Sequence, residues 1–259
     1  MNIVVLVKQV PDSSSERSLR ESDKTVDRDS ASLVINEMDE YAIEEALKLR
    51  EAHGGEVTVL TVGPDRATET IRKALSMGPD KAVHVSDEAI HGSCAVQTSK
   101  VLAKALGTLE WDLVISGAES TDGQVSAVPA MLAERLGVAQ LTGARKLDVE
   151  GSTFTIERQT DDGYQVVQAA APAVVSVWDT INEPRYPSFK GIMQAKSKPV
   201  STLSLAELGI GADEVGLANA TSEVVEFAPR PPKAAGVKVS DEGDGGTKLV
   251  EFLASQKFV

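Results

Sequence analysis

Four short apolar runs, each followed by a helical pattern, constrain the fold of this chain more than any other feature of its sequence. The runs are rich in β-branched residues and cover residues 3–7, 57–62, 82–85 and 113–116. Their continuous apolar character is typical of strands buried on both faces of a parallel sheet. The helical patterns cover residues 39–52, 68–77, 95–106 and 127–136. Because βαβ crossovers are right-handed and put helices on both sheet faces, the sequence predicts a doubly wound, mainly parallel α/β fold.

Strands of another kind follow residue 140. Residues 145–150, 153–160 and 164–169 alternate between apolar and polar side chains, with turn residues between them. This period of two predicts an antiparallel meander, and the apolar run at 172–177 predicts one more buried strand. Residues 12–32 are too polar for either pattern, so they form either an exposed hairpin or a functional loop.

The C-terminal part of the chain is expected to be an extended arm. We place an α/β nucleotide-binding domain at residues 1–197 and the arm at residues 198–259, with a short helix at 203–208. Prolines predict an extended linker over residues 229–236, and a final apolar helix is predicted at 247–256. A helix this apolar must bury its side chains, either on a partner subunit or on its own domain.

Composition excludes two classes of partner. With 39 acidic against 26 basic residues the net charge is −13, and such a surface repels nucleic acid and anionic membranes. Aromatic residues make up 4% of the chain, too few for the stacking platforms of a single-strand binder. The lone Cys94 cannot form an internal disulfide, and no apolar run is long enough for a signal peptide or a membrane span. We therefore expect a cytoplasmic protein that is not embedded in a membrane.

The strongest functional signal is the stretch that starts at Gly117 and reads Gly-Ala-Glu-Ser-Thr-Asp-Gly-Gln-Val. It lies between the buried strand at 113–116 and the helical pattern that follows. Loop amides and the positive end of a helix dipole can bind a phosphate in this setting without Lys or Arg. The alternative is an ordinary βα turn whose polar residues cap the helix.

Three further segments are predicted to converge with this loop. Lys8 follows the first strand, Asn36 and Asp39 lie at the start of the first long helix, and Val62-Gly63 ends the second strand. The carboxyl ends of parallel strands share one edge of the sheet, which is where open α/β sheets bind ligands. Helix capping by Asn36 or Asp39 would explain that segment by itself. Taken together, the four segments favour a nucleotide site.

No strong catalytic motif accompanies this site. The sequence lacks the G-x-G-x-x-G, G-K-[ST], H-E-x-x-H and G-x-S-x-G patterns. Its histidines, His53, His84 and His91, are scattered, so a His-based metal site has little support. The carboxylate pair at 161–162 is explained by turn chemistry.

Residues 182–193, Asn-Glu-Pro-Arg-Tyr-Pro-Ser-Phe-Lys-Gly-Ile-Met, form a second candidate. Two prolines predict an extended path, and aromatic and aliphatic side chains add apolar surface to what should be a surface loop. Either the loop packs on its own domain or it offers an apolar anchor to another protein.

These segments resemble the beta subunit of electron-transfer flavoproteins, and the resemblance covers most of the chain. It is carried by residues 4–10, 42–50 and 69–78, by the loop after Gly117 and, most specifically, by Glu157-Arg158, Pro172-Ala-Val-Val and Asn182-Glu-Pro-Arg-Tyr-Pro-Ser. The resemblance implies an electron carrier, not an enzyme. It implies a heterodimer whose alpha subunit holds most of the FAD, while the beta subunit buries one AMP.

The resemblance, together with the four segments, also implies the residues of the nucleotide site. They are Leu6, Lys8, Asn36, Met38, Asp39, Val62, Gly63, Gly117, Ala118, Glu119, Ser120, Thr121, Asp122, Gly123, Gln124, Val125 and Ser126. Met38 and the region of Ser13 would approach the edge of the flavin. Two alternatives remain: a bifurcating form in which a second FAD replaces AMP, and a flavin-free regulatory domain that binds an adenine nucleotide.

The implied partners are other redox proteins besides the alpha subunit. Acyl-CoA dehydrogenases and other flavoprotein dehydrogenases would reduce the FAD, and a membrane quinone oxidoreductase would reoxidise it. We expect the second candidate segment to dock the dehydrogenases, with Phe189 as its anchor. Its docking residues would be Tyr186, Pro187, Ser188, Phe189, Lys190, Ile192 and Met193.

Overall fold

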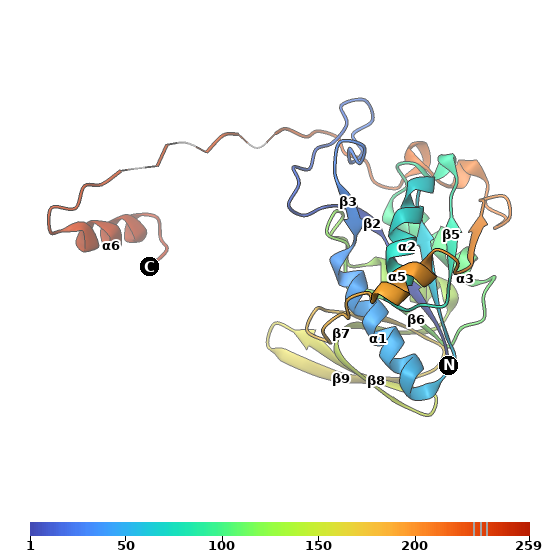
Figure 1. The fold of residues 1–259 in the computed structure, drawn as a ribbon. Coiled ribbons are helices and arrows are strands. Elements are labelled where there is room, and N and C mark those ends of the chain that lie inside the picture. Colours follow the sequence, from blue (N-terminus) through green and yellow to red (C-terminus); the bar gives the residue numbers. More distant parts are fainter. Residues whose placement is uncertain (230, 234, 237) are drawn as a thin grey trace. The chain divides into compact units, whose positions relative to one another are not determined.

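The computed structural model describes residues 1–229, 231–233, 235–236 and 238–259, in two compact units that cover Met1–Val225 and Glu226–Val259. A nine-stranded sheet with the order β11-β5-β4-β1-β6-β10-β7-β8-β9 runs through the first unit (Figure 1). Its parallel centre consists of β1 (Asn2–Leu6), β4 (Glu56–Val62), β5 (Lys81–Val85), β6 (Leu113–Gly117) and β10 (Ala173–Val177). The chain winds from β1 to β4 and β5 in one direction, and from β6 to β10 in the other. The predicted doubly wound sheet is confirmed.

Helices cover both faces of the sheet. On one face, α1 (Glu37–His53) and α2 (Thr68–Met77) share a buried apolar cluster with alternate strand residues such as Ile3 and Val5. On the other face, α3 (Ala95–Leu106) and α4 (Val128–Leu136) pack with the intervening residues, such as Val4 and Leu6. Because successive strand residues point to opposite faces and both are covered, the strands must be apolar throughout.

The predicted meander is present, but its first strand is longer than expected. It comprises β7 (Ala139–Glu150), β8 (Thr153–Thr160) and β9 (Gly163–Ala170), drawn in yellow-green and yellow in Figure 1. The first half of β7 pairs in parallel with β10, and the second half pairs antiparallel with β8. The first half of β7 belongs to the parallel part of the sheet and does not alternate cleanly between apolar and polar residues. The sequence pattern therefore indicated only the second half of this strand.

The polar segment after the first strand is framed by a small antiparallel sheet. Strands β2 (Gln9–Pro11) and β3 (Leu33–Ile35) pair with each other, and an isolated bridge joins Leu19 and Val26 inside the intervening loop. The structure therefore shows a hairpin-like excursion at residues 12–32, and two of its arginines, Arg17 and Arg28, contact the loop after β6.

The first unit continues past the boundary expected at residue 197. Strand β11 (Val200–Leu203) pairs in parallel with β5, and the side chains of Leu205, Leu208, Ile210 and Val215 join the buried cluster under α3 and α4. The helix expected at 203–208 is wrong, because β11 ends there and a turn follows. Short 3-10 helices complete this unit: η1 (Asp65–Ala67), η2 (Glu88–Ile90), η3 (Ala212–Glu214) and η4 (Leu217–Asn219).

The second unit contains α6 (Gly245–Ser255), which matches the predicted final helix to within two residues. Its side chains of Leu249, Val250 and Phe252 are about half exposed. The linker predicted at 229–236 includes residues 230 and 234, which lie outside the described residues. Within the described ranges, no helix has the length and apolar character needed to cross a membrane.

Candidate functional site

The winding direction of the chain reverses between β1 and β6, which are neighbours at the centre of the sheet. The connections that leave these two strands run to opposite faces, so they diverge at the carboxyl edge. Ligands of open α/β sheets bind at such a point. Lys8 follows β1 and residues 118–127 follow β6, so two of the predicted segments meet here.

Lys8 and an arginine from the polar excursion both pair with the loop at Asp122. The Lys8 Nζ atom donates to Asp122 Oδ1 at 2.8 Å and to Ser120 Oγ at 3.2 Å, and Arg28 donates to Asp122 Oδ2. Although burial acts to raise the pKa of Asp122, Lys8 and Arg28 outweigh it and hold that pKa well below its usual range. The loop was expected to need no Lys or Arg, but the structure brings two cations to it.

Asn36 joins the start of α1 to the same loop. Its Nδ2 donates to Asp39 Oδ1 at 2.9 Å and to the Glu119 carbonyl at 3.0 Å, and its Oδ1 accepts from the Thr121 amide at 3.0 Å. The side chain makes no capping hydrogen bond to α1. Helix capping therefore does not explain Asn36, whose role is to bridge two of the predicted segments.

Asp39 lies beneath these contacts and is buried. Its carboxylate accepts from the Lys8 amide at 2.8 Å and from Asn36. Burial raises the pKa of Asp39 to about 7, against the hydrogen bonds from Asn36, Lys8 and Gly117, which lower it. A buried carboxyl that titrates near neutral pH is a common property of functional sites.

Gly117 is the last residue of β6, and the structure requires a glycine there for packing. A Cβ atom on Gly117 would lie 2.5 Å from Met38 Cβ and 2.8 Å from Asp39 Oδ1. The missing side chain therefore lets the start of α1 approach the end of the strand. Met38 is half-buried in this contact.

The second half of the loop after β6 is open to solvent. Ala118 is buried and its amide donates to the Val177 carbonyl, whereas residues 123–126 are exposed. Gln124 and Ser126 adopt left-handed φ angles of 49° and 56°, conformations that cost about 1–3 kcal/mol each and cluster at ligand sites. The Ser126 hydroxyl donates to Glu119 Oε2 at 2.6 Å. Helix α4 begins at Val128, one residue after the start expected at 127, so the exposed residues 123–126 precede it.

Three strand ends complete this edge on the side of α3 and α4. Leu6 and Val62 pack with the cluster of that side, and Ser116 follows Val114 of the same cluster by two residues. Gly63 is tied to β5, because its amide donates to the Val85 carbonyl and its oxygen lies 2.9 Å from His84 Nε2. The buried hydroxyls of Thr61 and Ser116 have no hydrogen-bond partner.

The second candidate segment is a short helix, not the extended loop that was expected throughout. Its first part is extended, and then α5 (Phe189–Ala195) begins with the Ser188 hydroxyl accepting from the Gly191 amide at 3.0 Å. The exposed fractions are 95% for Tyr186, 82% for Phe189, 47% for Ile192 and 53% for Met193. These exposures argue against the alternative in which Phe189 packs into its own domain.

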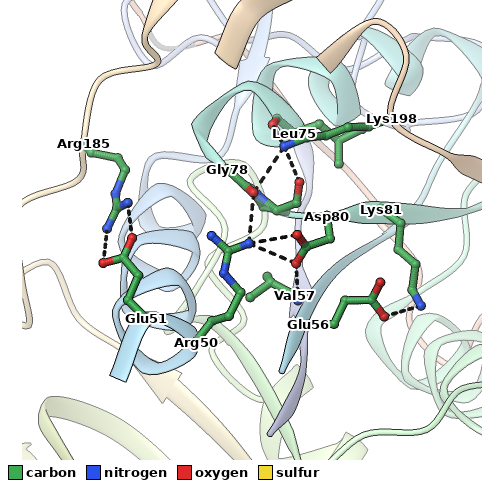
Figure 2. A network of polar contacts seen from close by, with 11 residues as sticks. Arg50, Glu51, Glu56, Val57, Leu75, Gly78, Asp80, Lys81, Arg185 and Lys198 are labelled. Carbon is green, nitrogen blue, oxygen red and sulfur yellow. Dashed lines mark hydrogen bonds and ion pairs between the residues drawn. The ribbon is translucent and has the colours of Figure 1, made fainter. Parts of the chain in front are cut away.

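Arg185 ties the start of this segment to α1. Its guanidinium donates to Glu44 at 2.7 and 3.0 Å and to Glu51 at 2.6 and 3.3 Å. These hydrogen bonds raise the pKa of Arg185 above its ordinary value. Asn182 adds contacts of 3.0 Å to the Tyr41 carbonyl and to Glu45. Figure 2 shows the pairing of Arg185 with Glu51 at the side of α1.

The other end of the segment is held by α2. Arg72 donates to the Ala195 and Lys198 carbonyls at 2.7 and 2.8 Å, and Lys198 Nζ donates to the carbonyls of Leu75, Gly78 and Pro79 at the end of α2 (Figure 2). Figure 1 shows α5 (orange) beside α2. A cavity of about 340 Å³ lies between them, lined by Arg72, Lys73, Ser76, Pro187, Ile192, Ala195 and Lys196. The exposed apolar residues are thus carried by a helix that is fixed at both ends.

Comparison with known proteins decides the family. The family model described as electron transfer flavoprotein domain matches residues 23–208, which include Asn36, the loop after β6 and α5. The chain is 57% identical over 264 residues to the electron transfer flavoprotein subunit beta of Mycobacterium bovis, covering 100% of this chain and 99% of that protein. The chain belongs to the electron transfer flavoprotein beta-subunit family.

Other members of this family are more distant but equally complete matches. The subunit beta of Thermoanaerobacterium thermosaccharolyticum is 36% identical over 261 residues, with 100% of both chains covered. That of Bacillus subtilis is 36% identical over 258 residues, with 99% of this chain and 98% of that protein covered. The predicted resemblance is confirmed, and the name of the subunit implies an alpha subunit.

Sequence reasoning missed some residues at the candidate site of this electron transfer flavoprotein subunit. Arg28 and Arg17, whose guanidinium donates to the Thr121 carbonyl, come from the polar excursion and reach the loop after β6. The concentration of arginines in an otherwise unassigned segment of an acidic chain was the one signal for them. No signal in the sequence indicated Ser116, because one serine at the end of an apolar strand is common. Only the structure shows that its buried hydroxyl has no hydrogen-bond partner.

Proposed function

We propose that this chain is the beta subunit of a heterodimeric electron carrier and that it holds one AMP at the carboxyl edge between β1 and β6. The alpha subunit would hold most of the FAD. Electrons would pass from acyl-CoA dehydrogenases and other flavoprotein dehydrogenases to the FAD, and then to a membrane quinone oxidoreductase, in the cytoplasmic compartment. The chain itself would carry no catalytic residue, because the redox chemistry belongs to the flavin.

The observation that carries the AMP proposal is the convergence of three segments at the reversal point of the sheet. Lys8, Asn36 and the loop after β6 are joined there by hydrogen bonds of 2.8–3.2 Å. Residues 123–126 are exposed, and of their amides that of Gln124 already donates to the Ser120 carbonyl at 2.9 Å. The amides of Gly123, Val125 and Ser126 and the start of α4 would suit the phosphate, with Lys8 and Arg28 nearby. Leu6 and Val62 supply apolar surface for the base. The unpartnered hydroxyl of Ser116, on the same face as Leu6 and Val62, fits a ligand that brings polar atoms.

Met38 and the Ser13 region are proposed to face the flavin of the alpha subunit. Met38 is half-buried at the start of α1, and the Ser13 hydroxyl donates to Glu37 Oε1 at 3.0 Å. Both therefore lie at the same end of α1 as Asn36. This arrangement would place AMP and FAD on neighbouring parts of one edge.

The exposed residues of the second segment support a docking role. A carrier with several redox partners needs a small apolar anchor and not a large fixed interface, and transient contacts lie below about 1,200 Å² in total. Phe189 and Tyr186 are the most exposed aromatic side chains in the described part of the chain. We propose that Tyr186, Pro187, Ser188, Phe189, Lys190, Ile192 and Met193 dock the dehydrogenases.

Nucleotide extraction from the co-purified heterodimer tests the function as a whole. We expect one AMP and one FAD per heterodimer, with the absorbance bands of a bound flavin. Two FAD and no AMP would establish the bifurcating form instead. An adenine nucleotide without flavin would favour the regulatory domain, and the absence of any nucleotide besides the FAD would refute the AMP site.

Gly123→Val tests the loop. A Cβ atom at Gly123 would meet Ser120 Oγ at 3.4 Å and Lys8 Nζ at 3.9 Å, both ordinary contacts, so the variant should fold. Its branched side chain would crowd the exposed residues 123–126, so AMP content and heterodimer stability should fall together. Gly123→Ala is the milder control. Full AMP content in the valine variant would show that the loop does not bind the phosphate.

A further inference from the structure

Ser116 is a buried polar residue whose hydroxyl is left without a partner. It is the next-to-last residue of β6, it is 6% exposed, and its Oγ makes no hydrogen bond. Roughly nine in ten buried polar groups in native proteins are paired, so each exception requires an explanation. The structure offers one, because Ser116 lies at the reversal point between β1 and β6.

The Ser116 side chain points away from α1. A Cβ atom on the next residue, Gly117, would point toward Met38 and Asp39 on α1. Successive strand residues point to opposite faces of the sheet. Ser116 therefore faces the side of α3 and α4, where Leu6 and Val62 also lie. The register of β1 and β6 pairs Val5 with Ile115, which brings Leu6 alongside Ser116.

The neighbouring strand shows that a hydroxyl at this level can be satisfied by the protein. Ser176 of β10 pairs directly with Ser116 in the register, and its Oγ accepts from the Gly143 amide at 3.0 Å. The unpaired hydroxyl is therefore a property of Ser116 and not of that level of the sheet. What differs is that Ser116 adjoins β1 and the proposed ligand edge.

We propose that the Ser116 hydroxyl hydrogen-bonds the nucleoside half of the adenine nucleotide, and this inference rests on the proposed AMP site. The cations Lys8 and Arg28 meet the loop at Asp122, six residues beyond Ser116 along the chain, and the exposed residues of the loop lie at 123–126. The phosphate belongs with those groups. Ser116 lies on the sheet side of the loop, between the apolar Leu6 and the uncharged Ser176, a setting that suits a neutral base or ribose. A ligand polar atom there would pair the hydroxyl.

The structure also provides a matched control. Thr61 near the end of β4 is 1% exposed, and its hydroxyl likewise has no partner. It follows Val59 by two residues, and Val59 belongs to the cluster of α1 and α2, so Thr61 faces the opposite side of the sheet. A ligand that contacts Ser116 beside Leu6 should not contact Thr61.

Binding to the nucleotide-depleted heterodimer tests the proposal, with AMP and adenosine as separate probes. Ser116→Ala should raise the Kd for both probes by about tenfold, the equivalent of one net hydrogen bond. The unfolding midpoint of the nucleotide-free heterodimer should stay the same or rise, because the variant removes an unpaired buried hydroxyl. Ser116→Cys, which keeps a weak donor in a slightly larger side chain, should show a smaller increase in Kd. Thr61→Val should leave both Kd values unchanged.

Several results would overturn the proposal. Wild-type Kd values in Ser116→Ala, or an equal loss in Thr61→Val, would remove the contact. A loss for AMP but not for adenosine would place the contact at the phosphate and refute its assignment to the nucleoside. If the wild-type heterodimer binds neither probe, the AMP site itself fails, an outcome distinct from the failure of Ser116 alone.

Discussion

Phe189→Ala separates docking from packing in a single variant. The Phe189 side chain is 82% exposed, so its removal takes little apolar surface out of the folded protein. A substitution at such a position changes the free energy of unfolding by about 0.5 kcal/mol or less. A buried phenylalanine would instead cost about 3–5 kcal/mol. We expect the stability, AMP content and FAD content of the variant heterodimer to match the wild type.

The effect on docking should be much larger than the effect on folding. Truncation of an interface anchor costs about 2 kcal/mol or more, which corresponds to a factor of roughly 30 in affinity. Stopped-flow measurement of flavin reduction by an acyl-CoA dehydrogenase, over a range of carrier concentrations, should show half-saturation shifted by about that factor. The limiting rate at saturation should change less, because the flavin environment is untouched.

Tyr164→Ala is the control for a general loss of aromatic surface. Tyr164 is 51% exposed on β9, where Arg145 lies 4.1 Å from its ring centre, and β9 is the far edge strand of the sheet. This variant should accept electrons as the wild type does. The docking argument is refuted if Phe189→Ala reduces stability by several kcal/mol while its folded fraction accepts electrons normally, or if its kinetics are unchanged.

Three further predictions concern the arm, the Arg185 contacts and pH. Removal of residues 226–259 should leave the first unit folded but raise the heterodimer Kd, because α6 exposes apolar side chains that need a partner. Arg185→Gln should lower the free energy of unfolding by about 1–3 kcal/mol, because the buried carboxylate of Glu44 loses its partner. This variant should also slow electron uptake. Glu51→Gln, at an exposed carboxylate, should lower the free energy of unfolding by about 1 kcal/mol or less. The pKa of Asp39 is about 7 in the folded protein and about 3.9 in the unfolded chain. The stability that Asp39 contributes is therefore complete below pH 4 and is lost as the pH rises to about 7. Asp39→Asn should remove this dependence of the unfolding free energy on pH.

Each of these has a measurement that decides it. An unchanged heterodimer Kd by titration would count against a role for the arm in binding the alpha subunit. Equal thermal midpoints for Arg185→Gln and Glu51→Gln would show that the buried Glu44 contact is not the dominant one. Denaturant unfolding of the wild type and Asp39→Asn between pH 4 and 8 should give diverging curves, and parallel curves would contradict the raised pKa.

The sequence alone determined the architecture. Strands buried on two faces must be apolar throughout, and helices covered on one face must be amphipathic, so both appear as local patterns. Helices 68–77 and 95–106 were predicted to the residue, since a glycine follows the last turn of each. The apolar residues around Phe189 were also visible locally, but only the structure decides between packing on their own domain and exposure to solvent, and it shows them exposed.

The tertiary structure decided which distant residues meet. Strand β11 was not predicted because its four residues are too few to show a local pattern, and its pairing with β5 is what makes them a strand. Lys8 and Arg28 reach Asp122 from 114 and 94 residues away in the sequence. The partnerless hydroxyl of Ser116 is likewise a property of its surroundings and not of β6 itself. Local patterns record whether a side chain is buried, whereas the identity of its neighbours depends on where the chain crosses the sheet, and packing of the whole unit sets that crossing.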